Sequence, residues 1–338
     1  MGDSLVRKSG GHLEGGAPTV TGIARSRAIA GLAAIVALAC LSACSLVRRG
    51  ESRQAIVFTA DTQGNVLPCS ECGGGQGGLA RRATIVRRLR TSGPSLLLLD
   101  AGNAFFGGDS LGCPGWPIVA SYELLHYDAV NLSYRDFRFG KQTTLRLIEG
   151  AAFVPLSATL VDERTGRLLA KPYVVRTLGN RRIAIVGATE LPDAVADLPH
   201  IKAQLAGITV RPVMEALREW LPRASAEADA VVLLFYGAAG GLKAITAAFP
   251  DRFVAVLVGG IRPDELPAHA TLPVVATSDE GRRIAHLGLA DARVTGIEQI
   301  EVGTPIAADP AMLALLQRHL AVEGGCRPAS PIANVPTP

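Results

Sequence analysis

Short apolar runs alternate with amphipathic segments along most of the chain. A first strand is predicted at residues 54–60, and the continuous apolar run at 95–100 is typical of a strand buried on both faces. Residues 79–91 between them fit a helix with an arginine-rich outer face. The pattern predicts further helices at 118–126, 212–226 and 242–249, and further strands at 129–132, 153–158, 182–188, 230–235 and 253–258.

The last third of the chain is rich in strand patterns. Strands are predicted at 272–277, 283–290 and 293–302, and a hairpin at 159–178 with its turn at Thr165-Gly166. A closing helix at 309–322 has Asp309 as its N-cap and Pro310 at its first position. Because the late strands follow one another without helices, we expect a layered α/β domain and not a pure doubly wound sheet.

The N-terminal region has the pattern of a lipoprotein signal peptide. Arg25 and Arg27 precede an apolar segment at 28–39 that is too short to span a membrane comfortably. Small residues then lead to a cysteine in Leu41-Ser42-Ala43-Cys44. We expect cleavage and lipidation at Cys44; an ordinary secretory signal or a short anchor is the alternative.

This interpretation sets the expected organisation and location. Residues 1–44 form the signal ending at lipidated Cys44, 45–53 a tether, 54–322 the folded domain, and 323–338 a disordered tail rich in Pro, Ala and Gly. Ser45 after the cysteine predicts outer-membrane sorting in a Gram-negative cell. We therefore expect a protein of the bacterial cell envelope whose membrane partner is reached through the lipid anchor, facing the periplasm or the surface.

Composition supports a folded domain and argues against nucleic acid. The 338 residues are 48% hydrophobic and 19% charged, which is enough apolar material for a core. The net charge is only +4, without a dense basic tract or interleaved aromatic residues. We expect no nucleic-acid partner.

Polar or glycine-rich motifs follow five of the predicted strands. In chain order these are Asp61-Thr62-Gln63, Asp100-Ala101-Gly102-Asn103, the segment 133–140 (SYRDFRFG), Phe235-Tyr236-Gly237, and 259–263 (GGIRP). In this order and spacing the chain resembles the calcineurin-like metallophosphoesterases, on their 5′-nucleotidase branch. Members of that family carry D-x-H, D-x-G-D, G-N-H-E-F-D-x-G, a histidine before glycine, and G-G-H-x-H at the matching places.

The resemblance implies a sandwich of two mixed β-sheets flanked by helices, with a pair of divalent ions at these motifs. It covers the catalytic domain only, and we expect the family's C-terminal nucleotide-binding domain to be absent. Of the usual ligands Asp61 remains. The other ligand positions are vestigial: Gln63, Asn103, Tyr134, Arg135, Tyr236, Ile261 and Pro263. Arginine stays protonated and cannot ligate a cation, so we expect a dismantled metal centre and no cofactor.

A cysteine- and glycine-rich loop lies between the first strand and the first helix. Cys69 and Cys72 precede Gly77 and Gly78, and Arg81-Arg82 follow at the helix start. Backbone N–H groups of such a loop, with these arginines, could bind an anion. We favour the simpler interpretation, a tight turn onto a solvated basic helix.

Four cysteines beyond Cys44 remain in an oxidising compartment, and they allow three pairings. We expect two structural disulfides, and rank 69–72 with 113–326 slightly above the crossed pairings of Cys69, Cys72, Cys113 and Cys326. A redox-active Cys69/Cys72 pair and a four-cysteine zinc site are the alternatives.

Three functions remain open from the sequence. The first is a non-catalytic, lipid-anchored binding or scaffold protein, with an envelope protein or a small anionic ligand as partner. The second is an enzyme of altered chemistry, a hydrolase or a thiol-redox enzyme using the Cys69/Cys72 loop. The third is a conventional metal-dependent phosphoesterase with non-standard ligands. We favour the first, because most of the metal ligands are replaced.

Overall fold

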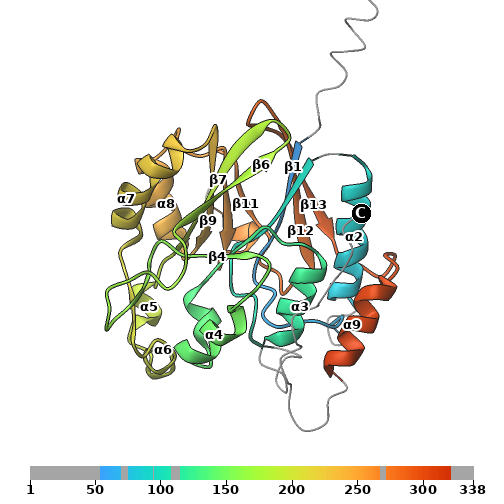
Figure 1. Cartoon of the computed structure of the whole chain (residues 1–338), viewed down its shortest axis with the longest axis horizontal. Coiled ribbons are helices and arrows are strands. Elements are labelled where there is room, and N and C mark those ends of the chain that lie inside the picture. Colours follow the sequence, from blue (N-terminus) through green and yellow to red (C-terminus); the bar gives the residue numbers. More distant parts are fainter. Residues whose placement is uncertain (1–53, 70–74, 94, 108–114, 267–271, 321–338) are drawn as a thin grey trace, which may run out of the picture. The chain divides into compact units, whose positions relative to one another are not determined.

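The computed structural model describes residues 54–69, 75–93, 95–107, 115–266 and 272–320. Two larger β-sheets face each other, and helices cover the outer side of each sheet (Figure 1). The predicted fold class, a layered α/β sandwich of two mixed sheets flanked by helices, is confirmed. The predictions for Cys44, the tether and the tail fall outside the described residues.

The first sheet has six strands in the order β13-β12-β1-β2-β3-β4. Strands β1 to β4 are parallel, and β12 and β13 join antiparallel at the edge beside β1. The carboxyl ends of β1, β2 and β3 therefore meet at one edge of the sheet. The strands are β1 (Gln54–Thr59), β2 (Ser95–Asp100), β3 (Ala129–Asn131), β4 (Val154–Leu156), β12 (Arg283–Ala290) and β13 (Arg293–Glu301).

The second sheet has five strands in the order β11-β10-β9-β7-β6, and only β6 runs antiparallel. A separate two-stranded sheet pairs β5 with β8. The strands are β5 (Leu160–Asp162), β6 (Tyr173–Leu178), β7 (Arg181–Thr189), β8 (Ile208–Val210), β9 (Ala230–Tyr236), β10 (Ala255–Gly259) and β11 (Val274–Ala276).

Successive side chains of each strand point to opposite faces of its sheet, and the buried ones form three hydrophobic cores. Ile56 and Phe58 of β1 pack with Ile185 and Leu257 between the sheets, whereas Val57 faces the opposite side. This is the period of two that a strand imposes. The outer face of the first sheet packs against α2 (Leu79–Thr91), α3 (Trp116–Leu124), α4 (Lys141–Ile148) and α9 (Pro310–Leu320), and that of the second against α7 (Val213–Ala226) and α8 (Ala239–Ala248).

The predicted hairpin at 159–178 forms only in its first part. Its turn forms and Val161 bridges Leu168 antiparallel across it, with the Leu169 N–H donating to the Leu160 carbonyl at 2.9 Å. However, β5 pairs with β8, and β6 pairs with β7 across Gly179-Asn180. The sequence pattern also missed α4, β8 and the short helices α5 (Asp193–Ala196), α6 (Pro199–Gln204), η2 (Tyr134–Phe137) and η3 (Pro263–Glu265).

The predicted cap of the last helix is confirmed. The Asp309 carboxylate accepts the Met312 N–H at 2.9 Å and also pairs with Arg87 at 3.0 Å. Among the described residues, no helix is long and apolar enough to cross a membrane.

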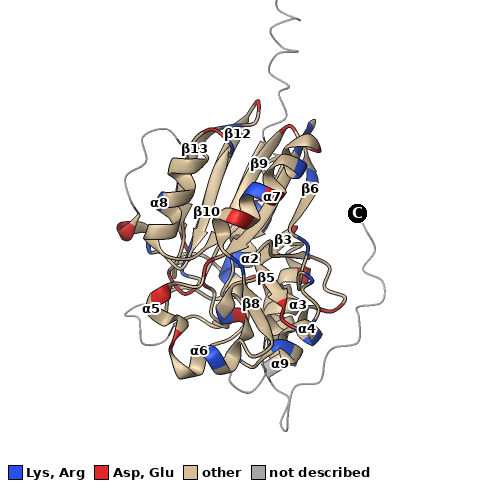
Figure 2. Cartoon of the chain, turned by 90° about the vertical axis from the view of Figure 1, so that its left-hand side faces the viewer, with Lys and Arg blue, Asp and Glu red and all other residues tan. Residues whose placement is uncertain are grey.

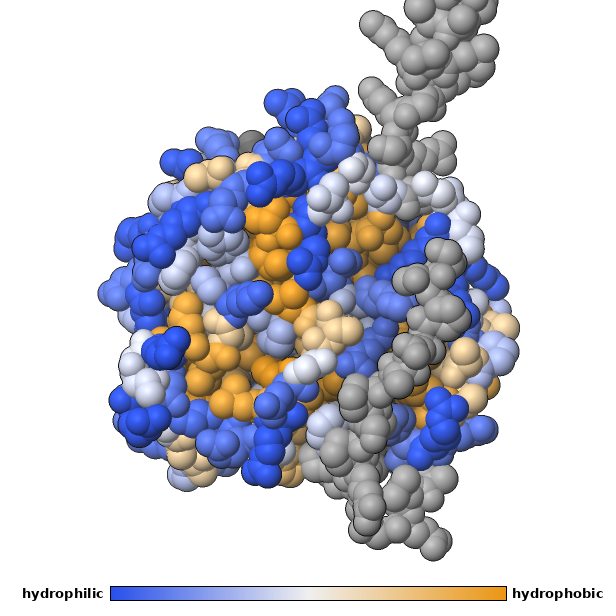
Figure 3. Space-filling model, in the orientation of Figure 1, coloured by the Kyte–Doolittle hydropathy of each residue, from blue (hydrophilic) through white to orange (hydrophobic). Residues whose placement is uncertain are grey.

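The surface is mixed in both charge and hydropathy. Lys and Arg are interspersed with Asp and Glu over the described part of the face in Figure 2. Apolar residues reach the surface in separate patches in Figure 3, with hydrophilic residues between them. Neither view singles out one surface as a docking face.

Candidate functional site

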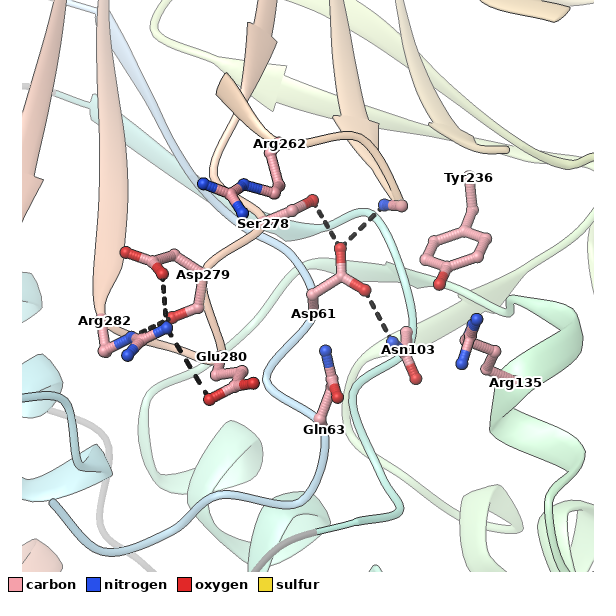
Figure 4. A pocket seen from close by; sticks show the side chains of 11 residues that line it. Asp61, Gln63, Asn103, Arg135, Tyr236, Arg262, Ser278, Asp279, Glu280 and Arg282 are labelled. Atoms are coloured by element: carbon pink, nitrogen blue, oxygen red, sulfur yellow. Dashed lines mark hydrogen bonds and ion pairs between the residues drawn. The ribbon is translucent and has the colours of Figure 1, made fainter. Parts of the chain in front are cut away.

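Loops from the carboxyl edges of both sheets enclose a polar cavity of about 370 Å³ (Figure 4). Asp61 follows β1, Asn103 follows β2, and Arg135 lies on η2 after β3. The second sheet contributes the end of β9 and the loops after β10 and β11. The cavity is lined by Asp61, Gln63, Asn103, Arg135, Tyr236, Gly260, Arg262, Ser278, Asp279, Glu280 and Arg282.

Two of these loops are locked together through their backbones. The Asp61 N–H donates to the Gly102 carbonyl at 3.0 Å, and the Gln63 N–H donates to the Asn103 carbonyl at 2.9 Å. Asp61, Gln63 and Asn103 all have φ between 50° and 57°, the left-handed region that Asp and Asn tolerate best. Both corners therefore have a defined shape that aims their side chains into one space.

The Asp61 carboxylate accepts three hydrogen bonds from within the protein. Asn103 Nδ2 donates to one oxygen at 2.6 Å. The other oxygen accepts the Gly260 N–H at 2.8 Å and the Ser278 hydroxyl at 2.5 Å. Asp61 is only 4% exposed, so these three donors replace most of its contact with water.

The remaining positions that the motifs single out fall into two groups. Gln63, Asn103, Arg135 and Tyr236 join Asp61 at the cavity, whereas Tyr134, Ile261 and Pro263 are not part of its lining. Tyr134 is buried behind the wall, edge-on to the Tyr236 ring at 5.7 Å. Ile261 is buried in the core under α7 and α8, and Pro263 opens η3. The structure thus gathers five of the eight positions.

The described side chains of the cavity do not offer the ligand atoms that a pair of divalent cations needs. Such a pair needs carboxylates and imidazoles with free lone pairs. Within the described ranges, no cluster of three or more His, Cys, Asp or Glu side chains is arranged to hold a metal ion. Asp61 already accepts three hydrogen bonds, and the exposed Arg135 adds a positive charge to the same cavity.

Asp136, in the segment 133–140, organises the wall of the cavity, a role that the motif comparison does not predict. It is 1% exposed and accepts the backbone N–H groups of Asn103 and Ala104, both at 2.8 Å, and of Ser133 at 2.9 Å. Burial raises the pKa of its carboxyl, and these hydrogen bonds oppose the rise. The sequence signal was the spacing of Ser133 and Asp136, a capping box.

A second buried cluster lies beneath the cavity around Asp100. Its carboxylate accepts hydrogen bonds from Thr59 at 2.7 Å, Tyr122 at 2.8 Å and the Gly102 N–H at 2.8 Å. Burial raises the pKa of Asp100 to about 7, although these hydrogen bonds and the nearby Arg82 oppose the rise. The carboxyl is therefore poised to titrate near neutral pH.

The structure corrects the expected position of Arg82. This residue is 1% exposed, on the inner face of α2, and its guanidinium contacts the Tyr127 hydroxyl at 3.5 Å and the Gly281 carbonyl at 3.4 Å. It cannot reach an anion from solvent. Arg82 instead ties α2 to the loop that carries Ser278 and Glu280.

The glycine loop also has the geometry of a turn. The Gly77 N–H donates to the Val302 carbonyl at 2.6 Å, and the Leu79 N–H donates to the Val66 carbonyl at 3.0 Å. Arg81 bonds the Gly75 carbonyl. Because these donors are used within the fold, the tight turn fits better than an anion site built on Gly77, Gly78, Arg81 and Arg82.

The cysteine predictions fall mostly outside the described residues. Cys69 is disulfide-bonded in the structure. Cys72, Cys113 and Cys326 lie in segments that are not described, so the connectivity stays a prediction.

No family model matches the chain. Among curated proteins, a snake venom 5′-nucleotidase from Naja atra is 27% identical over 231 residues, which are 62% of this chain and 41% of that protein. The Homo sapiens 5′-nucleotidase is 27% identical over 245 residues, covering 67% of this chain and 40% of that protein. The chain thus spans less than half of the length of these relatives.

Solved structures agree on the fold. A calcineurin-like phosphoesterase from Bacillus subtilis matches with a TM-score of 0.66 at 20% identity, covering 79% of this chain and 96% of that one. A 5′-nucleotidase precursor from Thermus thermophilus matches with a TM-score of 0.62 at 22% identity, covering 80% of this chain and 59% of that one. The chain is therefore related in sequence to 5′-nucleotidases and has the calcineurin-like phosphoesterase fold, as its motifs predict.

Proposed function

We propose that this protein is a lipid-anchored, non-catalytic relative of the 5′-nucleotidases, in which a hydrogen-bonded polar pocket has replaced the dimetal centre. Its role is then to bind a ligand or partner in the cell envelope. The single observation that carries this proposal is that Asp61, the one ligand position that keeps its usual residue, accepts three hydrogen bonds from within the protein.

A metal-ligating carboxylate must present oxygen lone pairs to the cation. The Asp61 oxygens face three hydrogen-bond donors, two of them side chains at positions 103 and 278 and one the backbone of Gly260. A cation entering here would have to break these bonds in a site largely withdrawn from water. Loss of hydrogen bonds to a charged group costs about 1.5–3 kcal/mol each, so the exchange is unfavourable without further ligands.

The neighbouring replacements supply no such ligands. Asn103 stands where the family has a bridging carboxylate, and its amide donates to Asp61. Arg135 carries a permanent positive charge into the cavity that the metal ions would share. The positive charge of Arg135 repels a divalent cation in the same cavity, which adds to the effect of the Asp61 hydrogen bonds.

The lipid anchor is the second half of the proposal. It rests on the segment from Arg25 to Cys44, with its short apolar stretch and its small residues before the cysteine. A protein held at the membrane surface by its first mature residue presents the pocket to the surrounding envelope compartment.

Turnover of adenosine 5′-monophosphate and of 2′,3′-cyclic AMP by the purified full chain, with added manganese, tests the proposal. We expect no turnover above that of a protein-free blank. Manganese-dependent turnover by the folded wild type would overturn the proposal.

A further inference from the structure

Two of the three arginines among the described lining residues of the cavity, Arg262 and Arg282, are paired with carboxylates. Arg262 bonds Asp264 at 3.2 Å, and Arg282 bonds Asp279 at 2.7 Å. Among the ion pairs of the described residues, Arg135 has none with a carboxylate, and its side chain is exposed to solvent. Among the described lining residues, Arg135 is therefore the arginine without a carboxylate in direct contact, although Asp61 in the same cavity attracts it at longer range.

Aromatic packing holds Arg135 at the wall. Its guanidinium carbon lies 5.5 Å from the centre of the Tyr134 ring, and Tyr134 in turn packs edge-on against Tyr236. In Figure 4 the Tyr236 hydroxyl and the Arg135 guanidinium point toward one another at the edge of the cavity. Burial raises the pKa of Tyr236 well above its usual range, so the hydroxyl keeps its proton and can donate it in a hydrogen bond.

The opposite wall carries charges of both signs. Glu280 and Asp279 lie there with Arg282, on the loop after β11 (Figure 4). The Gln63 side chain lies between the two walls and reaches into the cavity, where its amide group can donate a hydrogen bond. An anionic group thus meets the Arg135 guanidinium on one side, whereas on the other side Arg282 is already paired with Asp279 and Glu280.

We propose that this pocket binds a small ligand through a terminal oxyanion, a phosphate monoester or a carboxylate, held by the Arg135 guanidinium and the Tyr236 hydroxyl. The planar guanidinium presents two parallel N–H groups that match such an oxyanion. The cavity volume lies in the range of small-molecule sites. This inference rests on the proposed function, since it assigns the positive charge of the site to arginine and not to metal ions.

Calorimetric titration of the full chain with inorganic phosphate, and separately with acetate, tests the inference. We expect saturable binding of at least one of these probes. Binding of phosphate would indicate a phosphate monoester as the ligand, and binding of acetate would indicate a carboxylate. Arg135→Gln should weaken that binding by about tenfold or more, and Arg135→Lys should recover part of the loss, since it restores the charge without the planar fork. Tyr236→Phe should weaken it less.

Arg138→Gln is the matched control. Arg138 caps the same short helix and is exposed, but it does not line the cavity. We expect this variant to bind like the wild type. Thermal melts of all variants check that the fold is kept.

Two outcomes separate the inference from the proposed function. Binding that Arg135→Gln leaves unchanged, or no binding of either probe by the folded wild type, overturns the inference alone. Binding that disappears when a chelator removes metal and returns with manganese overturns the proposed function instead, because metal would then supply the charge.

Discussion

Replacement of Asp61 by alanine should destabilise the fold strongly, because the carboxylate serves as an internal hydrogen-bond acceptor. The change removes one buried carboxylate and leaves the donors of Asn103, Gly260 and Ser278 without their acceptor. A carboxylate that served only to hold metal would leave no donors unsatisfied in the metal-free protein. The change in the free energy of unfolding therefore distinguishes an internal hydrogen-bond acceptor from a carboxylate kept only for metal.

The magnitude follows from the contacts. Hydrogen bonds to a charged group contribute about 1.5–3 kcal/mol each, and three bonds to one group are not additive, so we expect a loss of about 3–5 kcal/mol. Part of this, about 1 kcal/mol, comes from alanine at a φ of 50°. In the Asp61→Asn variant, asparagine tolerates the positive φ and keeps one acceptor oxygen. The expected loss in free energy of unfolding is therefore smaller, about 2 kcal/mol.

Urea unfolding followed by circular dichroism measures these losses, and about 3–5 kcal/mol corresponds to a midpoint lowered by about 1–2 M for a domain of this size. Asp197→Ala is the matched control, because Asp197 is an exposed aspartate paired with Lys202 at 2.9 Å, and its replacement should leave the urea midpoint close to that of the wild type. An Asp61→Ala variant as stable as this control, or more stable than the wild type, refutes the reasoning.

Three further predictions concern other parts of the chain. The pKa of Asp100 is about 7 in the folded protein, against an ordinary value of 3.8. The folded state therefore binds this proton more tightly than the unfolded state does. The free energy of unfolding should fall by about 4 kcal/mol as the pH rises from about 4 to 7. Asp100→Asn should flatten that slope in urea titrations across this range, and an unchanged slope would contradict the assignment. Gly102→Ala should cost about 2 kcal/mol or more in thermal unfolding, since Gly102 has a φ of 109° and an added Cβ would lie 2.9 Å from the Asn131 carbonyl; a wild-type melting temperature would speak against it. Cys44→Ser should abolish lipidation and release the protein from membranes, as intact mass and cell fractionation would show, and a variant that stays membrane-bound and processed as before would rule the anchor out.

Much of the fold was predictable because strongly apolar or strictly periodic segments leave few alternatives. The strand Ser95–Asp100 and the helix Leu79–Thr91 have the predicted bounds. The hairpin error had a different cause. A local turn at Thr165-Gly166 is real, but Gly179-Asn180 supplies a second two-residue turn, and β6 gains a full partner in β7 across it. That dipeptide was a readable hairpin signal.

The site was predictable in its positions but not in its chemistry. Strand order brings Asp61, Asn103 and Arg135 to one edge, as the motifs indicate. The donor from Ser278 comes from 217 residues further along the chain, which a strand pattern cannot pair with Asp61. Arg82 looks like any surface arginine of a basic helix, and only the packing of Tyr127 and Gly281 around it shows that it is buried.

The manganese content of the purified full chain tests the central claim most directly. The protein is dialysed against excess manganese, passed through a desalting column, and measured by inductively coupled plasma mass spectrometry. Because Asp61 accepts three hydrogen bonds from within the protein and Arg135 shares its cavity, we predict a content far below one ion per chain. A content of about two ions per chain in the folded wild type would contradict the account.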